Sequence, residues 1–144
     1  MKHAVHYSSK KHDWETPTFV FDDIQNKLKI KFDLDPCATK KNAKCKKFFT
    51  KEMDGLTKKW TGNVFMNPPY GKEIHLWVKK AYESVKSGDA KCVVGLLPAR
   101  TDTRWFHEYM YQGGDVYFIR GRIKFSGHKN SAPFPSMIVV WRTR

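Results

Sequence analysis

Apolar positions recur along the chain first at helical spacing and then at strand spacing. Over residues 17–29 they return every four positions, which predicts an amphipathic helix. Thr16 and Pro17 are residue types that favour the N-cap and first turn of a helix, so the helix is expected to begin there. Residues 30–34 alternate between apolar and polar, which predicts a strand that stops at Asp35-Pro36.

The middle of the chain repeats this succession of strand and helix. The short apolar run Val64–Met66 predicts a strand, and apolar positions at helical spacing from Ile74 predict a helix that ends near Gly88. The continuous apolar run Cys92–Leu97 is typical of a strand buried on both faces of a sheet. A further helix is expected over residues 103–110.

The last two predicted strands, Val116–Ile119 and Met137–Trp141, are joined by a polar loop and suit an antiparallel edge. Phe48-Phe49 adds a short strand. This order predicts a small α/β domain of the doubly wound, Rossmann-like class, with a mostly parallel twisted sheet, an antiparallel edge strand and flanking helices. A length of 144 residues suits one such domain, expected over residues 14–144 after a basic, flexible arm over residues 1–13.

The charge of the chain points to an anionic partner. It carries 27 Lys and Arg residues against 14 Asp and Glu, a formal net charge of +13. Such an excess favours a polyanion, most simply nucleic acid, although a solvated basic surface explains the same count. No stretch reaches the ~20 apolar residues of a membrane span, and no signal peptide is expected.

The cysteines and histidines give little sign of a metal or disulfide site. Three cysteines without CxxC spacing argue against a disulfide scaffold and a zinc ribbon, so a reducing cytoplasm is the expected location. His3, His6 and His12 lie in the predicted arm without a carboxylate partner and are interpreted as solvated. No bound metal is expected.

One tetrapeptide, Asn67-Pro68-Pro69-Tyr70, carries a specific chemical meaning. It follows a predicted strand directly, and in open α/β sheets ligands bind outside the carboxyl ends of the strands. Two consecutive prolines stiffen the turn and fix the direction of the Asn67 side chain and of the backbone carbonyls. We call residues 67–70 the Pro-Pro corner. A turn without any catalytic role is the alternative, because Asn-Pro also begins ordinary turns.

The Pro-Pro corner is suited to activating a planar amine. The exocyclic amine of adenine is a poor nucleophile because its lone pair is delocalised into the ring. If the Asn67 amide oxygen and the Pro68 carbonyl each accept one of its N–H bonds, the lone pair becomes free to attack, and positive charge develops against acceptors already in place. Tyr70 would stack on the base, which is worth ~1–3 kcal/mol. A sulfonium methyl donor suits this chemistry and needs no metal.

The Pro-Pro corner is similar to the catalytic motif of S-adenosylmethionine-dependent amino methyltransferases. Other segments, spread over most of the chain, resemble the small Dam-type DNA N6-adenine methyltransferases of bacteriophages and prophages. These segments are Asp13-Trp14-Glu15-Thr16-Pro17, Phe32–Ala38, Asn63–Gly71, Leu97–Thr103 and Arg120–Phe125. The resemblance implies a Rossmann-like methyltransferase domain in a bacterial host cytoplasm, with S-adenosylmethionine as donor and DNA as partner. It also implies that the catalytic residues are Asn67, Pro68, Pro69 and Tyr70.

The resemblance further implies which residues bind the donor. Asp35-Pro36 matches the acidic start of the cofactor motif, and Thr16-Pro17 matches a segment that closes over the donor. Asp54 is a candidate for contact with the donor's adenine or ribose. The usual GxG after the acidic residue is absent, and the small Ala38 stands in that stretch. A helix cap or a turn explains Thr16, Asp35 and Asp54 without any donor.

Nucleic-acid contacts are expected from basic and polar residues near the ends of predicted strands. The candidates are Lys72, Arg100, Thr101, Arg104, Arg120, Arg122 and Lys124. The loops 40–47 and 126–136 are candidates for target recognition, because neither a helix-turn-helix nor a zinc finger is evident. A solvated surface explains any single one of these residues as well.

Three functions therefore fit the sequence. The first is a DNA adenine-N6 methyltransferase, for which a duplex target base must be flipped out of the stack. The second keeps the chemistry and acts on RNA bases or a protein glutamine; the basic charge disfavours a protein substrate. The third is a non-catalytic nucleic-acid-binding module whose Pro-Pro corner is structural.

Overall fold

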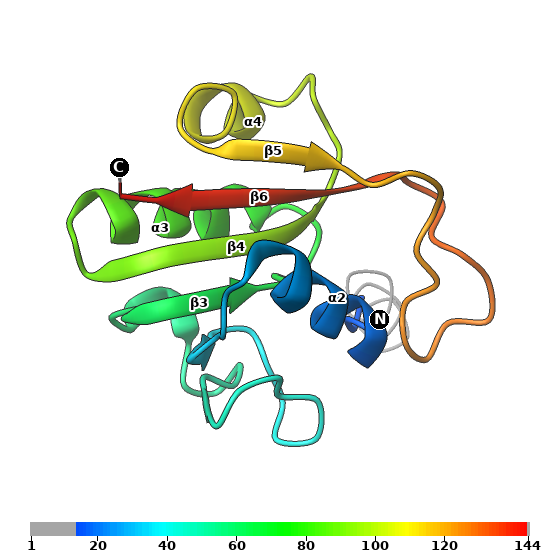
Figure 1. Ribbon diagram of the computed structural model, residues 1–144, viewed down its shortest axis with the longest axis horizontal. Helices are drawn as coiled ribbons and strands as arrows, with labels where there is room; N and C mark the ends of the chain where they lie inside the picture. Colours follow the sequence, from blue (N-terminus) through cyan, green and yellow to red (C-terminus); the bar gives the residue numbers. More distant parts are fainter. Residues whose placement is uncertain (1–13, 144) are drawn as a thin grey trace, which may run out of the picture.

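A computed structural model of the chain describes residues 14–143. Its six strands form one sheet in the order β2-β1-β3-β4-β6-β5, and Figure 1 shows the larger strands of that sheet with their helices. The strands are β1 (Leu34–Asp35), β2 (Lys47–Phe48), β3 (Gly62–Met66), β4 (Ala90–Pro98), β5 (Asp115–Phe118) and β6 (Ser136–Arg142). β1, β2, β3 and β4 pair in parallel, whereas β6 pairs antiparallel with both β4 and β5.

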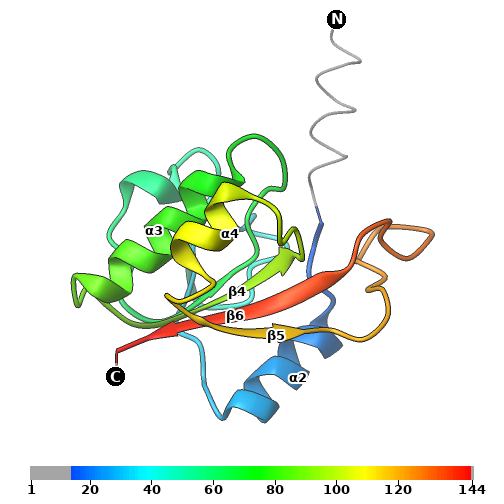
Figure 2. The ribbon, with the colours of Figure 1, turned by 90° about the horizontal axis from the view of Figure 1, so that it is seen from above.

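The helices cover both faces of this sheet. They are α2 (Thr18–Leu28), α3 (Ile74–Lys86) and α4 (Arg104–Tyr109), with a short 3-10 helix η1 (Gly55–Thr57). Figure 2 shows α3 and α4 on one side of the strands and α2 on the other. The predicted doubly wound α/β class, with a mostly parallel sheet and antiparallel pairing towards one edge, is therefore confirmed. The strand that runs against the others, β6, lies second from that edge.

The core is built around β4. Every residue of β4 except Lys91 is buried, as expected for a strand with helices on both faces. From one side α3 contributes Trp77, Val78 and Ala81 to the core. From the other side α2 contributes Phe21, whose ring meets Phe65 of β3 edge-on at 5.0 Å. The central parallel pair β3 and β4 is therefore held firmly, and both strands end at the same edge of the sheet.

The predicted strand over residues 30–34 is largely wrong. Only Leu34 and Asp35 enter the sheet as β1, although Phe32 and Leu34 are buried as the alternation indicated. α2 ends at Lys29 in a left-handed conformation with a φ of 58°, and the next residues only bridge the distance to the sheet. Single contacts hold them instead of a ladder, such as Asp33 N–H to Asn63 O at 2.7 Å. The alternation of apolar and polar residues predicted correctly which side chains are buried. It could not predict whether a neighbouring strand is placed to form backbone hydrogen bonds with these residues.

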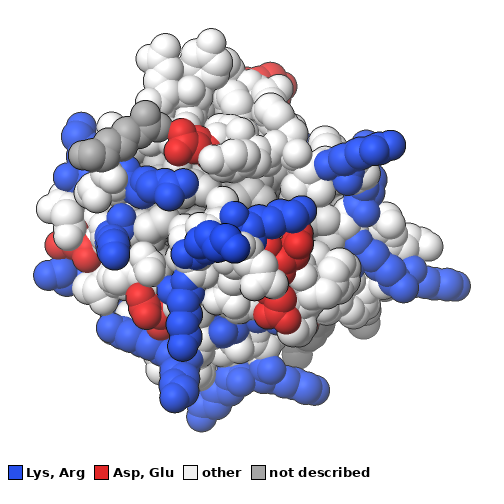
Figure 3. Space-filling model, viewed as in Figure 1, with Lys and Arg blue, Asp and Glu red and all other residues white. Residues whose placement is uncertain are grey.

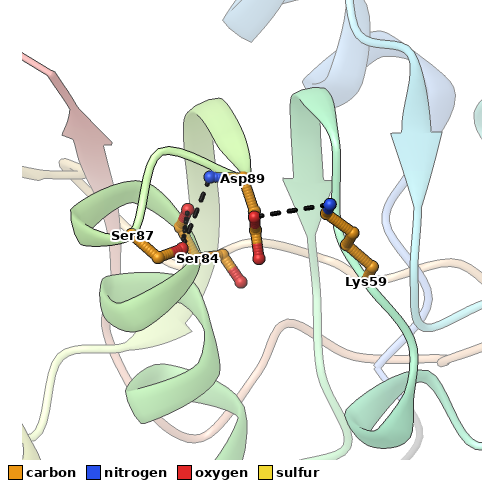
Figure 4. Close-up of polar contacts among 4 residues, drawn as sticks. All are labelled: Lys59, Ser84, Ser87 and Asp89. Carbon is orange, nitrogen blue, oxygen red and sulfur yellow. Dashed lines mark hydrogen bonds and ion pairs between the residues drawn. The ribbon is translucent and has the colours of Figure 1, made fainter.

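A small polar group lies where β3 and β4 begin, at the other end of these strands from the Pro-Pro corner, and is drawn in Figure 4. Ser87 Oγ donates to Ser84 O at 3.2 Å and accepts from Asp89 N–H at 3.3 Å, which finishes the turn from α3 into β4. Asp89 also lies 3.7 Å from Lys59 Nζ, just before β3. This exposed ion pair contributes at most about 1 kcal/mol, so it assists the β3–β4 pairing only slightly.

Some sequence predictions concern features outside the sheet. The arm over residues 1–13, with His3, His6 and His12, lies outside the described residues. Within residues 14–143, no cluster of three or more His, Cys, Asp or Glu side chains is arranged to hold a metal ion. In that same part of the chain, no helix has both the length and the apolar character needed to cross a membrane.

Candidate active site

The Pro-Pro corner lies where the sequence predicted it, directly after the carboxyl end of β3. β4 runs parallel to β3 beside it, so the corner stands at the edge where both strands end. Pro68 and Tyr70 are buried, Pro69 is exposed and Asn67 is half-buried. The corner thus anchors two of its side chains in the core and leaves the others nearer to solvent.

The amide of Asn67 is held in one orientation. Its Nδ2 donates to the backbone carbonyl of Trp14 and to Thr16 Oγ1, the latter at 2.8 Å. A carbonyl oxygen can only accept, so turning the amide over would place oxygen against oxygen. The Oδ1 atom of Asn67 is buried and has no hydrogen-bond partner among the described residues. A buried acceptor without a partner costs about 1–3 kcal/mol and is suited to a ligand that brings an N–H group.

Thr16 does not have the role in the helix that the sequence predicted. The N-cap of α2 is Pro17, and no side chain caps the helix. Thr16 is only 3% exposed, and its hydroxyl is engaged with Asn67. The hydroxyl of Thr16 therefore bonds to Asn67, 51 positions further along the chain, and does not cap the helix as the local sequence predicted.

Tyr70 lies deeper than a residue that presents its ring to a ligand. It is 6% exposed, and its hydroxyl donates to Leu96 O at 3.0 Å. Burial raises the pKa of this phenol above its ordinary value, so it remains a donor at neutral pH. The rings of Phe134 and Phe125 lie edge-on to it at 5.5 and 6.5 Å. Tyr70 therefore presents little ring surface to solvent, and the stacking of a base on it stays a prediction.

A group of rings covers the Pro-Pro corner. The sequence analysis placed His128 and Phe134 in a candidate target-recognition loop, but it did not predict that they pack with Trp14 and Phe125 beside this corner. We call Trp14, Phe125, His128 and Phe134 the aromatic cover. Trp14 stacks on His128 at 4.3 Å and meets Phe134 edge-on at 5.1 Å. The backbone joins the same segments, because Ser126 N–H donates to Glu15 O at 3.0 Å. The available signal was the concentration of aromatic residues beside a polar loop.

The buried carboxylate Asp35, at the end of β1, organises the turn that follows it. It is 5% exposed, and its two oxygens accept from Cys37 N–H at 3.3 Å and Lys44 N–H at 3.1 Å. Burial raises the pKa of Asp35, while these two hydrogen bonds and the Lys44 charge act in the opposite direction. Asp35 is therefore an anchor for residues 36–44, and its contact with a donor stays a prediction.

Two segments that the resemblance assigned to the donor lie against each other. A Cβ atom added to Gly55 would lie 2.3 Å from Pro36 O, so the two backbones touch there. Exposed Asp54 stands beside this contact, and Trp60 Nε1 fixes it by donating to Gly55 O at 2.8 Å. Ala38 is buried. Gly55, which the sequence analysis interpreted only as part of a turn, is thus required for the close approach of these two segments.

The predicted nucleic-acid residues lie in three segments beyond β3, β4 and β5. All are exposed: Lys72, Arg100, Thr101, Arg104, Arg120, Arg122 and Lys124. Arg104 also lies 3.6 Å from Glu108, one helical turn further on. Figure 3 shows basic side chains spread over several parts of one face with acidic ones between them. On that face, charge alone therefore does not define a single binding surface.

The cysteines do not offer a nucleophile. Cys37, Cys45 and Cys92 are all free. Burial raises the pKa of all three thiols, that of Cys45 to about 12, and Asp35 adds to the effect at Cys37 and Cys45. Only the thiolate is a strong nucleophile, so the raised pKa values favour the protonated, weakly nucleophilic form of these side chains at neutral pH.

Comparison with known proteins identifies the family. A family model described as DNA N-6-adenine-methyltransferase (Dam) matches residues 4–144. The chain belongs to this Dam family. The "DNA N-6-adenine-methyltransferase" of Haemophilus phage HP1 is 33% identical over 147 residues, which cover 95% of this chain and 84% of that protein. The protein of the same name from Escherichia phage T1 is 33% identical over 108 residues, 74% of this chain and 44% of that protein.

Solved structures similar to this Dam-family chain are more distant. One is described as a putative RNA methyltransferase, PH1948, from Pyrococcus horikoshii. It has a TM-score of 0.46 and 20% sequence identity, and the match covers 67% of this chain and 50% of that one. A second, from Thermoplasma acidophilum, has a TM-score of 0.43 and 17% identity, with 73% and 59% covered. The family model and the two phage relatives, and not these structures, confirm the resemblance to Dam-type proteins at the level of the family.

A first prediction for this Dam-family chain concerns the contact between Gly55 and Pro36. We expect Gly55→Ala to separate the two segments, destabilise the protein by about 1–3 kcal/mol and lower its affinity for S-adenosylmethionine at least tenfold. Calorimetric titration and thermal unfolding measure the two effects. Gly88→Ala is the control, because it strains a positive φ where no atom lies within 4 Å. Donor binding unchanged in Gly55→Ala would exclude a donor site at this contact.

A second prediction separates the hydroxyl of Tyr70 from its ring. Tyr70→Phe removes the hydrogen bond to Leu96 O, so we expect the free energy of unfolding to fall by about 1–2 kcal/mol. Chemical denaturation measures this loss. Tyr117→Phe removes the same group from a side chain that is 47% exposed and should cost almost nothing. Equal stability of the two variants would mean that the buried hydrogen bond contributes no net stability.

Proposed function

We propose that this chain transfers a methyl group from S-adenosylmethionine to the exocyclic N6 amine of adenine in DNA. The observation that carries the proposal is the amide of Asn67, which keeps a buried oxygen without a partner while both N–H groups are occupied. The N6 amine brings the N–H group that this oxygen lacks. Membership of the Dam family and the name of the phage HP1 relative support the same reaction.

Asn67 acts on the amine in this proposal. Its Oδ1 accepts one N–H of the base, and the carbonyl of Pro68 is the expected second acceptor. Both draw the lone pair out of conjugation with the ring and face the nitrogen as it becomes positive. The stiffness of two consecutive prolines keeps the acceptors in place, so little reorganisation is needed during the reaction. In the transfer the N–C bond forms as the bond between the methyl group and the donor sulfur breaks, which leaves the donor as a neutral thioether. The nitrogen then releases one proton to solvent.

The proposed donor site is the pair of touching segments that contain Asp35-Pro36 and Asp54-Gly55. S-adenosylmethionine supplies an electrophilic methyl group on a sulfonium centre. Asp54 is exposed and accessible for hydrogen bonds to the hydroxyl or amino groups of this donor. The backbone contact at Gly55 and buried Ala38 would hold the turn in the shape that accepts it.

The proposed DNA contacts lie on exposed segments beyond β3, β4 and β5. Arg100 and Thr101 follow β4, and Arg120 and Arg122 lead into the aromatic cover. A duplex adenine has to leave the base stack before Asn67 can reach it. Movement of Phe125 and Phe134 would then open the ring of Tyr70 to that base.

Asn67→Ala is the direct test of the reaction. We expect the rate of methyl transfer to adenine to fall about 100- to 1,000-fold, because the acceptor aimed at the amine is gone. The assay supplies labelled S-adenosylmethionine with DNA, RNA and protein, followed by analysis of the products. Asn63→Ala, at the other end of β3, is the matched control and should remain close to the wild type.

The same assay separates the alternatives. Methylated RNA or glutamine without N6-methyladenine in DNA would overturn the proposed substrate. Absence of a saturable S-adenosylmethionine site would favour the non-catalytic binding module. Full turnover by Asn67→Ala would overturn the role of the amide.

A further prediction concerns the basic segment before the aromatic cover. We expect Arg122→Ala to weaken DNA binding and to lower the slope of log affinity against log salt concentration by about 1, if Arg122 contacts one phosphate. Fluorescence anisotropy over a series of salt concentrations measures both quantities. Lys91→Ala removes one charge at the opposite edge of the sheet and should leave the slope unchanged. An equal effect of both variants would indicate attraction by net charge alone.

A further inference from the structure

The hydroxyl of Thr16 accepts a hydrogen bond from the amide of Asn67 at 2.8 Å. We infer that Thr16 is a positioning residue for Asn67: together with the carbonyl of Trp14, it holds the amide so that Oδ1 faces the target amine. This inference rests on the proposed function, because it assumes that Asn67 acts on the base. It departs from the family resemblance, which associates Thr16-Pro17 with the donor.

The geometry of the amide is the first support. The two ends of a carboxamide have almost the same shape, so shape alone does not select an orientation. The wrong orientation would present an NH₂ group to the NH₂ group of adenine, and no hydrogen bond could form. Nδ2 of Asn67 has two N–H groups, and the structure gives each of them an oxygen: Trp14 O and Thr16 Oγ1. The carbonyl of Trp14 can only accept, so it selects the orientation that leaves Oδ1 for the substrate. The hydroxyl of Thr16 accepts from the second N–H and holds the amide in that orientation.

The burial of Thr16 is the second support. Thr16 is only 3% exposed, and its Oγ1 atom lies 2.8 Å from Asn67 Nδ2. Pro17 takes the N-cap position, so the hydroxyl is not needed by α2. No other hydrogen bond of Thr16 to a described residue competes for the oxygen. Asn67 is therefore the group that this hydroxyl serves.

The support of residues 14–16 is the third observation. Ser126 N–H donates to Glu15 O at 3.0 Å, and the ring of Trp14 packs on Phe134 and His128. The short segment that holds the amide is itself held by the segment after Arg122 and Lys124. Contacts that shift the aromatic cover therefore reach Asn67 through Trp14 and Thr16.

The test separates positioning from donor binding. Thr16→Val keeps the shape of the side chain and removes the acceptor, and Thr16→Ser restores the hydroxyl. We expect Thr16→Val to reduce the single-turnover rate at saturating donor about 5- to 30-fold, corresponding to loss of one hydrogen bond. The Kd for S-adenosylmethionine should change less than about twofold, and Thr16→Ser should recover most of the rate. Thr18→Val, two positions further on at an exposed site, is the matched control.

Several outcomes would overturn the inference. One is an unchanged single-turnover rate in Thr16→Val, which would mean that the hydroxyl does not position the amide. Another is a large rise in the Kd for S-adenosylmethionine with a wild-type rate at saturating donor, which would mean that Thr16 binds the donor. If Thr16→Val does not fold, the wild type provides a second test. Side-chain NMR should show both Asn67 Nδ2 protons protected from solvent exchange, and rapid exchange of either would contradict the positioning contacts. Wild-type protein that shows this protection but does not methylate DNA would refute the proposed function and leave the contacts confirmed.

Discussion

The site depends on one polar link between distant parts of the chain, the amide of Asn67 with Trp14 and Thr16. The partners are 53 and 51 positions apart in sequence, so only the folded chain can bring them together. The link occupies the two donors of Asn67 and leaves its acceptor unpaired within the described residues. A short hydrogen-bonded bridge thus converts a flexible amide into a fixed acceptor. Preorganisation of this kind reduces what a reaction must rearrange.

The topology of the sheet explains why the aromatic cover reaches this link. β5 is antiparallel to β6, and β6 is antiparallel to β4, so β5 and β4 end at the same edge. The segment between Phe118 and Ser136 therefore begins and ends at the edge where the Pro-Pro corner lies, and Figure 1 shows it projecting there. Because β6 lies between β4 and β5 and is antiparallel to both, the long segment that connects β5 to β6 lies at the same end of the sheet as the site. The cover is therefore formed without another domain. Arg120 and Arg122 lie on this segment.

Local sequence predicted the framework of the fold and missed the contacts that complete the site. The continuous apolar run in β4 and the helical spacing in α3 follow from burial on fixed faces, and both elements appeared as expected. The position of Asn67 followed from the proline pair after a strand. Thr16 was misread as a helix cap, because capping preference is local and the contact that overrides it is not. The partnership of Trp14 with Phe134 could not be predicted either, since no periodicity connects residues 120 positions apart.

The unpaired oxygen of Asn67 is costly, and this cost supports a functional origin. A buried acceptor without a partner costs about 1–3 kcal/mol, a large part of the ~5–15 kcal/mol by which domains are stable. Ser136 Oγ is the other such atom among the described residues, but a hydroxyl can rotate towards a new partner at little cost. The amide of Asn67 has no such freedom, because Trp14 O and Thr16 Oγ1 hold its other end. Buried polar groups are normally hydrogen-bonded, and Asn67 Oδ1, where the parallel strands end, departs from this rule. Such violations are expected where a ligand supplies the missing group.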